Sequence, residues 1–138
     1  MVRRLILDTN ALIAFARRTL DRDALADDDL AIAAVTVAEF RTGIELADTP
    51  ARAASRQAVL DAITSTIPVL DYTERTAPMH GRLLAHTRRS GQQRGAHDLI
   101  IAATAVEHSR TVLSADARVR FSDLPGVMWL SPQDLGNR

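Results

Sequence analysis

Short apolar runs alternate with longer amphipathic segments along the chain. The runs have the length of β-strands, and they predict strands at Arg4–Leu7, Leu30–Ala34, Ile67–Leu70, Thr111–Leu113 and Val127–Leu130. Apolar residues three or four positions apart predict helices at Thr9–Arg18, Val37–Ala47, Pro50–Ser65, Thr73–Arg89 and His97–His108. This alternation indicates an α/β fold, with a mostly parallel central sheet of about four to five strands flanked by helices on both faces.

Turn residues divide these elements. Asp48 and Thr49 close a hairpin of two helices, because Pro50 suits the first turn of a helix. Ser90-Gly91 ends the following long helix. Pro68 restricts the strand at 67–70 to the edge of the sheet, since proline donates no hydrogen bond to a neighbouring strand.

Length and composition limit the classes of protein. The 138 residues contain no repeat or linker, and we expect a single domain, residues 1–138. No apolar run reaches the length of a membrane span or a signal-peptide core, which favours a cytoplasmic protein. The absence of cysteine excludes disulfides and thiolate metal sites, so any metal must be held by oxygen or histidine.

The overall charge gives no sign of a polyanionic partner. Acidic and basic residues number 17 each, and every basic residue is arginine. The bulk composition therefore neither indicates nor excludes binding to a nucleic acid.

Four carboxylates fall where parallel strands end. Asp8 directly follows the first strand, and Asp116 lies three residues beyond Leu113. We expect Glu39 in the opening turn of the helix after the second strand, and Asp98 in the opening turn of the last helix. Ligands of open parallel sheets bind beyond the carboxyl ends of the strands, so these four side chains are candidates for one site.

Each carboxylate also has a purely structural interpretation. Asp8 is a suitable helix N-cap, and Thr36 with Glu39 matches a capping box. Asp98 would complement the positive end of a helix dipole, and Asp116 is an ordinary turn residue. Their convergence is therefore the argument for a site, because like charges brought together must hold protons or bind a cation. Oxygen ligands without cysteine suit Mg²⁺, or Mn²⁺.

The carboxylates lie in the motifs LILDTNALIAF, VTVAEFRTG, AHDLIIAATA and LSADARVRF. In order and spacing these motifs resemble those of PIN-domain nucleases, and most closely those of VapC-type toxins of bacterial toxin–antitoxin pairs. The resemblance extends from Leu5 to about Val127. It implies that Asp8, Glu39 and Asp98 are the shared acids, with Asp116 at a fourth position where relatives often carry Asp or Asn.

The resemblance also implies supporting residues. Thr9 and Asn10 fill the usual polar positions beside the first acid, and Ser114 stands where relatives commonly carry Thr or Ser, so we expect all three to support the acids by hydrogen bonding. Arg120 occupies a position where many relatives have another acid. We therefore predict no fifth carboxylate.

The function implied by this resemblance is a Mg²⁺-dependent endoribonuclease, the toxin of a type II pair, which cleaves structured RNA such as tRNA or ribosomal RNA and slows translation. Asp8 and Asp98 would be direct metal ligands, while Glu39 and Asp116 would hold metal-bound water or orient the nucleophile. The implied partners are a VapB-like antitoxin, a second copy in a homodimer, and the RNA. The antitoxin would use a groove on the helical surface and place an arginine against the acids.

Arginine pairs are the candidate RNA contacts. Arg17-Arg18 and Arg88-Arg89 would bind phosphates through charge. Aromatic residues are scarce, so recognition would depend on RNA shape and phosphates rather than on base stacking. His97 adjoins the site, but as a helix N-terminal polar residue it needs no substrate contact.

Two alternatives remain open at this point. A Mg²⁺-dependent phosphatase or phosphotransfer enzyme would use Asp8 as nucleophile. Phosphatases of the haloacid dehalogenase type carry a second Asp where this chain has Asn10, and they need a lysine that this chain lacks. A noncatalytic RNA-binding module would have no need to keep four acids.

Overall fold

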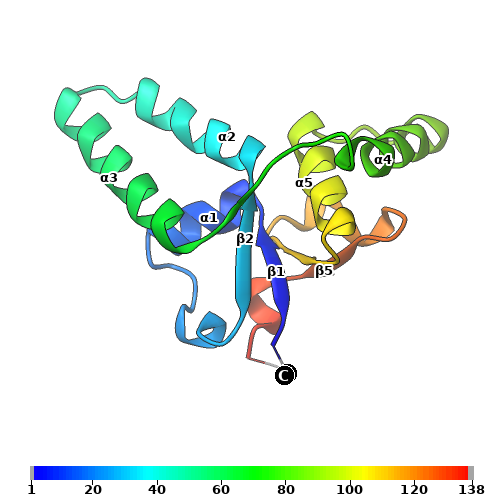
Figure 1. Ribbon diagram of the computed structural model, residues 1–138, viewed down its shortest axis with the longest axis horizontal. Coiled ribbons are helices and arrows are strands. Elements are labelled where there is room, and N and C mark those ends of the chain that lie inside the picture. Colours follow the sequence, from blue (N-terminus) through cyan, green and yellow to red (C-terminus); the bar gives the residue numbers. More distant parts are fainter. Residues whose placement is uncertain (1, 137–138) are drawn as a thin grey trace.

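Five parallel strands form one sheet at the centre of the computed structural model, which describes residues 2–136 (Figure 1). The order across the sheet is β3-β2-β1-β4-β5, with every neighbouring pair parallel. The strands are β1 (Arg4–Leu7), β2 (Asp29–Ala33), β3 (Val69–Leu70), β4 (Thr111–Leu113) and β5 (Met128–Leu130). The predicted parallel α/β sheet is confirmed, including the position of β3 at its edge.

Five α-helices connect these strands. They are α1 (Thr9–Ala16), α2 (Ala34–Glu45), α3 (Pro50–Thr66), α4 (Thr76–Ser90) and α5 (Ala96–Glu107). Short 3-10 helices follow in the loops: η1 (Asp23–Leu25), η2 (Ala117–Val119), η3 (Phe121–Asp123) and η4 (Pro132–Asp134). Helix α4 ends as predicted at Gly91, whose left-handed φ of 67° is a conformation that glycine adopts without strain. No helix within residues 2–136 has the length and apolar character that a membrane span requires.

The central strand supplies both hydrophobic cores. Successive side chains of a strand point to opposite faces of the sheet. Ile6 therefore packs with α4 and α5, in a cluster that includes Leu83 and Leu99. Leu5 and Leu7 pack on the other face in a second cluster with α1 and α3. Since both faces are covered, β1 is buried from Leu5 to its carboxyl end at Leu7.

Helix α2 begins earlier than predicted. The chain passes directly from β2 into the helix at Ala34, with Ala33 as an N-cap that makes no side-chain hydrogen bond. The capping-box interpretation of Thr36 and Glu39 is therefore wrong: Thr36 is the third residue of the helix, fully buried, and its hydroxyl has no hydrogen-bond partner. Glu39 consequently lies in the second turn of α2 instead of its opening turn.

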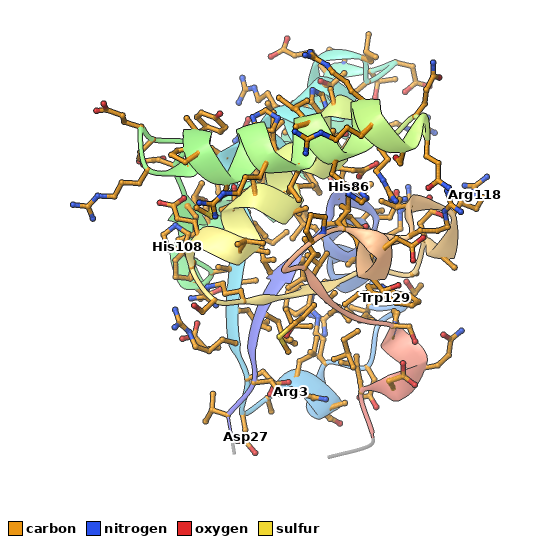
Figure 2. The ribbon with its side chains drawn as sticks, turned by 90° about the vertical axis from the view of Figure 1, so that its right-hand side faces the viewer. Arg3, Asp27, His86, His108, Arg118 and Trp129 are labelled. Carbon is orange, nitrogen blue, oxygen red and sulfur yellow. The ribbon has the colours of Figure 1, made fainter. Side chains whose placement is uncertain are left out.

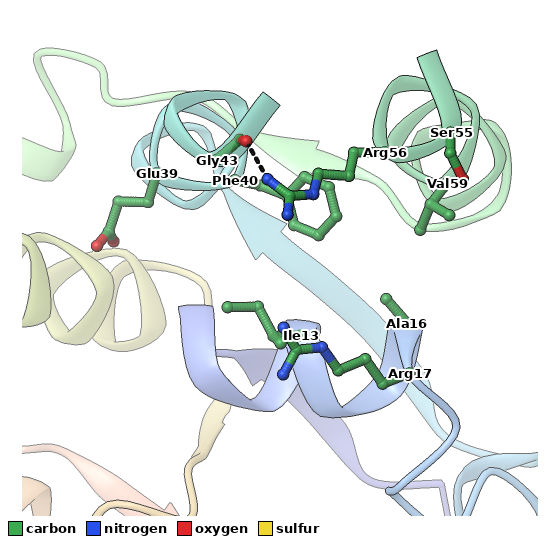
Figure 3. A pocket seen from close by; sticks show the side chains of 9 residues that line it. All are labelled: Ile13, Ala16, Arg17, Glu39, Phe40, Gly43, Ser55, Arg56 and Val59. Atoms are coloured by element: carbon green, nitrogen blue, oxygen red, sulfur yellow. Dashed lines mark hydrogen bonds between the residues drawn. The ribbon is translucent and has the colours of Figure 1, made fainter. Parts of the chain in front are cut away.

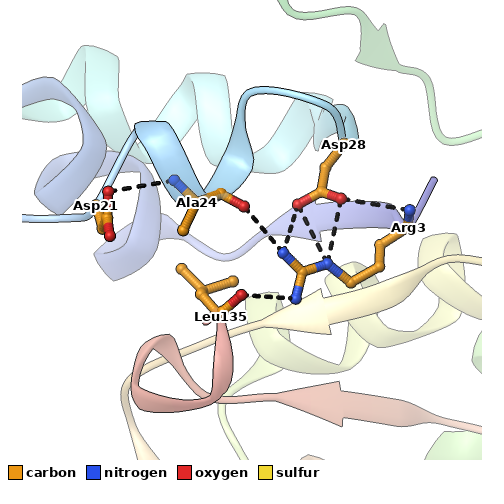
Figure 4. A network of polar contacts seen from close by, with 5 residues as sticks. All are labelled: Arg3, Asp21, Ala24, Asp28 and Leu135. Atoms are coloured by element: carbon orange, nitrogen blue, oxygen red, sulfur yellow. Dashed lines mark hydrogen bonds and ion pairs between the residues drawn. The ribbon is translucent and has the colours of Figure 1, made fainter. Parts of the chain in front are cut away.

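An arginine joins the amino-terminal edge of the sheet to two loops. Asp28, whose side chain is fully buried, accepts hydrogen bonds from Arg3 Nε and Nη2, the latter at 2.7 Å (Figure 4). The same guanidinium donates to the carbonyls of Ala24 in η1 and Leu135 after η4, at 3.0 and 3.1 Å. This network closes the end of the molecule opposite the carboxyl ends of the strands.

Candidate active site

Asp8 lies at the centre of the carboxyl edge of the sheet. It follows β1 directly, between β2 and β4, and its backbone N–H still donates to Leu113 of β4 at 3.2 Å. Its carboxylate caps α1, accepting a hydrogen bond from the Ala11 N–H at 2.8 Å. The side chain is almost completely buried. Asp8 is therefore both the predicted helix cap and a candidate site residue. Its second carboxylate oxygen is not used by the cap.

Glu39 reaches the same edge from α2. The Thr9 hydroxyl donates to Glu39 Oε1 at 2.6 Å, so the residue beside Asp8 holds the second carboxylate. His97, in the first turn of α5, places Nδ1 3.4 Å from Glu39 Oε2. Thr9 and His97 thus both contact Glu39, and the supporting role of Thr9 stays a prediction.

Asp98 is the third residue of α5, in the opening turn as predicted. Its carboxylate folds back over the N-cap residue Gly95, so that a Cβ on that glycine would lie 2.8 Å from Asp98 Oδ2. The backbone of Gly95 is in an extended conformation that any residue adopts. A larger residue at position 95 would therefore have to displace the carboxylate.

Asp116 caps the short helix η2 at the end of β4. Ser114 Oγ accepts a hydrogen bond from the Asp116 N–H at 3.1 Å. The carboxylate of Asp116 accepts hydrogen bonds from the backbone N–H and the guanidinium of Arg118, at 3.0 and 3.1 Å. Arg118 itself extends outward from the molecule (Figure 2) and is 92% exposed. Asn10 contributes to a shallow hollow next to Asp116 but is otherwise exposed.

The electrostatics show that the four carboxylates form one cluster. Burial raises the pKa of Asp8, and the charges of Asp116 and Glu39 raise it further, against the lowering effect of hydrogen bonds from Ser114 and Ala11. Burial also raises the pKa of Asp98, and all three other acids add to that shift. A cation bound beside Asp8 and Asp98 would offset the cost of ionising these two carboxyl groups.

Asp116 differs from Asp8 and Asp98 in the direction in which its pKa is shifted. The hydrogen bonds from the Arg118 side chain and backbone lower the pKa of Asp116 below its usual value. This carboxylate is therefore ionised and already paired with a positive charge, whereas Asp8 and Asp98 are destabilised as anions. The two acids expected to bind a metal directly are those with the greater need for one.

The donor chemistry fits a hard divalent cation. All four side chains offer carboxylate oxygens, and Mg²⁺ typically takes one or two carboxylates and keeps several waters. Within residues 2–136 no three His, Asp or Glu side chains are already arranged around one ion position. The arrangement thus suits an ion held through few direct ligands, with water completing its coordination.

Two cavities adjoin the carboxylates besides the shallow hollow at Asn10 and Asp116. The smaller, about 290 Å³, lies between the loop before α5 and η2, and both Asp98 and Asp116 line it. The larger, about 310 Å³, opens between α1, α2 and α3 and has Glu39 at one end (Figure 3). Its lining combines apolar side chains with two arginines: Ile13, Ala16, Arg17, Glu39, Phe40, Gly43, Ser55, Arg56 and Val59.

Some residues near the site had no signal in the sequence. Arg94 and Gly95 contact it through a loop packed against η2, 25 residues away along the chain. Of the four predicted RNA-binding arginines, Arg17 lines the larger cavity, and Arg18, Arg88 and Arg89 are exposed.

Comparisons with known proteins match most of the chain to one family. Residues 5–127 match the PIN domain family. The ribonuclease VapC5 of Mycobacterium tuberculosis is 38% identical over 114 residues, which cover 80% of this chain and 82% of that protein. A tRNA(fMet)-specific endonuclease VapC of Salmonella typhimurium is 29% identical, covering 88% of this chain and 92% of that protein.

The fold is shared with a solved structure at similar identity. The crystal structure of VapBC-5 from Mycobacterium tuberculosis, a member of the VapBC family of toxin–antitoxin systems, superposes with a TM-score of 0.74 and 31% identity. The match covers 93% of this chain and 96% of that one. The two chains therefore share one fold over nearly their whole lengths.

Proposed function

Because the chain belongs to the PIN-domain family, as a ribonuclease toxin of the VapC type, we propose that it is a Mg²⁺-dependent endoribonuclease that cleaves structured RNA and so inhibits translation. The substrate would be a tRNA or a ribosomal RNA. The observation that carries the proposal is the convergence of Asp8, Glu39, Asp98 and Asp116 at one edge of the sheet, where burial and the charges of neighbouring acids raise the pKa of Asp8 and Asp98.

The four acids have different tasks in this proposal. Asp8 and Asp98 hold the metal directly, because burial and mutual repulsion give them the strongest need for a cation. Glu39, fixed by Thr9, and Asp116, fixed by Arg118, orient water from either side. A bound Mg²⁺ would supply Lewis acidity, lowering the pKa of water and offsetting charge on the phosphodiester.

Arginines outside the acids bind the RNA backbone. Arg17-Arg18, directly after α1, and Arg88-Arg89, in the last turn of α4, are exposed and offer positive charge to phosphates. Reversing both pairs to glutamate should weaken RNA binding and reduce the slope of log Kd against log salt by roughly one per lost phosphate contact. Unchanged affinity and slope would contradict this assignment.

The larger cavity is the groove for the antitoxin. An apolar segment would cover Ile13, Phe40 and Val59, and a basic side chain at its end would meet Glu39 (Figure 3). Arg17 and Arg56 face the same groove, so an acidic residue in the segment would complement them. The cognate partner is accordingly a VapB-like protein, and the toxin forms a homodimer that carries one such groove on each copy.

The decisive experiment compares the wild type with Asp8→Asn on structured RNA, with Mg²⁺ and with EDTA. The asparagine keeps the cap on α1, because its amide oxygen still accepts from Ala11, but it removes a ligand charge. Cleavage should fall at least about a hundredfold in the variant and vanish with chelator. Equal cleavage by the two proteins, or cleavage indifferent to EDTA, would refute the proposed function.

A further inference from the structure

The loop before α5 and the loop after β4 are linked by an arginine that the proposed mechanism does not use. Arg94 Nη1 donates to the carbonyl of Val119 and, at 3.0 Å, to that of Arg120. In return Arg120 Nη2 donates to Gln92 Oε1 at 2.5 Å. Two segments 25 to 28 residues apart in sequence are thus tied in both directions.

Each linked segment carries one of the metal-binding candidates. Asp98 lies four residues beyond Arg94, at the start of α5, and Asp116 caps the helix η2 that ends at Val119. Arg94 lines the cavity that Asp98 and Asp116 share. The link therefore joins the segment that carries Asp98 to the segment that carries Asp116.

The contact is maintained at an energetic cost. Nε and Nη2 of Arg94 are buried without a hydrogen-bond partner, which is unfavourable for donors removed from water. Arg120 adopts a left-handed φ of 53°, a strained conformation for a residue other than glycine. Strain and unpaired donors at one contact persist where the surrounding structure requires the geometry, and they cluster at functional sites.

We propose that Arg94 is a positioning residue of the active site: its guanidinium fixes the η2 loop against the loop before α5, and so sets the spacing between Asp98 and Asp116. The inference rests on the proposed function, since that spacing matters only if both acids serve one cation. A direct contact between Arg94 and RNA is disfavoured, because its two free nitrogens are closed off from solvent, whereas Arg118 is exposed.

The test uses Arg94→Met, which keeps the length of the side chain and removes its donors, and Arg94→Lys, which retains a charged donor. Arg52→Met is the matched control for loss of one charge, because Arg52 is an exposed residue of α3 that pairs with Asp48. Three properties are measured: Mg²⁺ binding by calorimetry, hydrogen exchange of the amides of residues 116–121, and kcat and KM for RNA cleavage.

Arg94→Met should weaken Mg²⁺ binding about tenfold, accelerate exchange in residues 116–121 and lower kcat about tenfold with little change in KM. Arg94→Lys should recover part of each loss, and Arg52→Met should match the wild type. Unchanged Mg²⁺ affinity and exchange in Arg94→Met would overturn the proposal, as would an effect confined to KM.

The role of Arg94 can also be tested if Arg94→Met does not fold or if the wild type cleaves no RNA. If Arg94→Met does not fold, Gln92→Ala removes the reciprocal bond alone, and it should accelerate exchange in residues 116–121; unchanged exchange there would refute the link. If the wild type cleaves no RNA, the proposed function fails. Mg²⁺ affinity and amide exchange still decide whether Arg94 positions the two acids.

Discussion

Asp8 is a residue whose burial serves the site at the expense of the fold. Its pKa is raised by burial, so the native protein binds this proton more tightly than the unfolded chain does. The stability of the metal-free protein therefore decreases as pH rises from the ordinary aspartate value of 3.8 through the raised pKa of Asp8. Above that range the full cost of the buried anion is present.

Asp8→Asn should consequently stabilise the metal-free protein in EDTA at pH 7, although it lowers cleavage in Mg²⁺. We expect a gain of about 1 kcal/mol, or roughly 4 °C in Tm, and the gain should shrink towards pH 4, where the wild-type carboxyl is protonated. Thermal unfolding of both proteins at the two pH values, with and without Mg²⁺, measures it. A variant less stable than the wild type at pH 7 would show that Asp8 is not strained as an anion.

Gly95 is predicted to matter for the position of Asp98. Gly95→Ala suits the backbone, but the new methyl group would lie 2.8 Å from Asp98 Oδ2 and must displace that carboxylate. Cleavage should fall about tenfold, with Mg²⁺ affinity falling in parallel. Gly81→Ala on α4, where an added methyl group meets no atom within 4 Å, is the control.

The control has its own expected result. Gly81 is inside a helix, so alanine there should stabilise the protein by about 1 kcal/mol without loss of cleavage. If Gly95→Ala cleaves RNA as well as Gly81→Ala does, the space above Gly95 is not needed by the site.

At the scale of single elements, the stability of a Thr36 variant shows where α2 begins. The change in unfolding free energy has opposite signs for a helix that starts at Thr36 and for one that starts at Ala34. As a helix N-cap, Thr36 would contribute about 1 kcal/mol through its hydroxyl, and Thr36→Val would destabilise. In the observed structure the hydroxyl is buried without a partner, so the isosteric valine should stabilise by about 1 kcal/mol. Equilibrium unfolding in urea, with Thr36→Ser as a control that keeps the hydroxyl and loses a methyl group, distinguishes the two.

The sequence predicted most elements because their periodicity and their terminal residues agree. Pro50, Gly91 and the apolar run of β1 each mark a boundary by backbone chemistry that the neighbouring chain does not alter. The start of α2 was missed because Ala33-Ala34-Val35 suits a buried strand and a buried helix equally well. Only the packing against α3 and α5 decides between them.

At the scale of the whole molecule, the convergence of the four acids was predictable from the sequence. The contacts that hold the acids in place were not. Parallel strands bring their carboxyl ends to one edge, which places Asp8, Glu39 and Asp116 together from topology alone. The ion pair of Asp116 with Arg118 and the link through Arg94 depend on loop conformations, which local sequence does not specify.

Arg3 stabilises the molecule as a whole, because it joins β1 to η1 and to the segment after η4. Arg3→Met would leave the buried carboxylate of Asp28 without its guanidinium, and it should cost about 3 kcal/mol of unfolding free energy. The double variant Arg3→Met, Asp28→Asn should recover a large part of this loss. Urea unfolding of the three proteins checks it, and additive losses in the double variant would show that the two side chains are not coupled.

The contact between Arg3 and Leu135 also has a practical consequence (Figure 4). Residues near the two ends of the chain lie side by side, at the edge of the sheet remote from Asp8. A fluorophore, an affinity label or a surface linker attached at Arg3 or Leu135 would be remote from the carboxylates. A short peptide bridging the two would allow new ends to be opened at Asp48-Thr49, the tip of the helical hairpin, giving a circular permutant with an unaltered site.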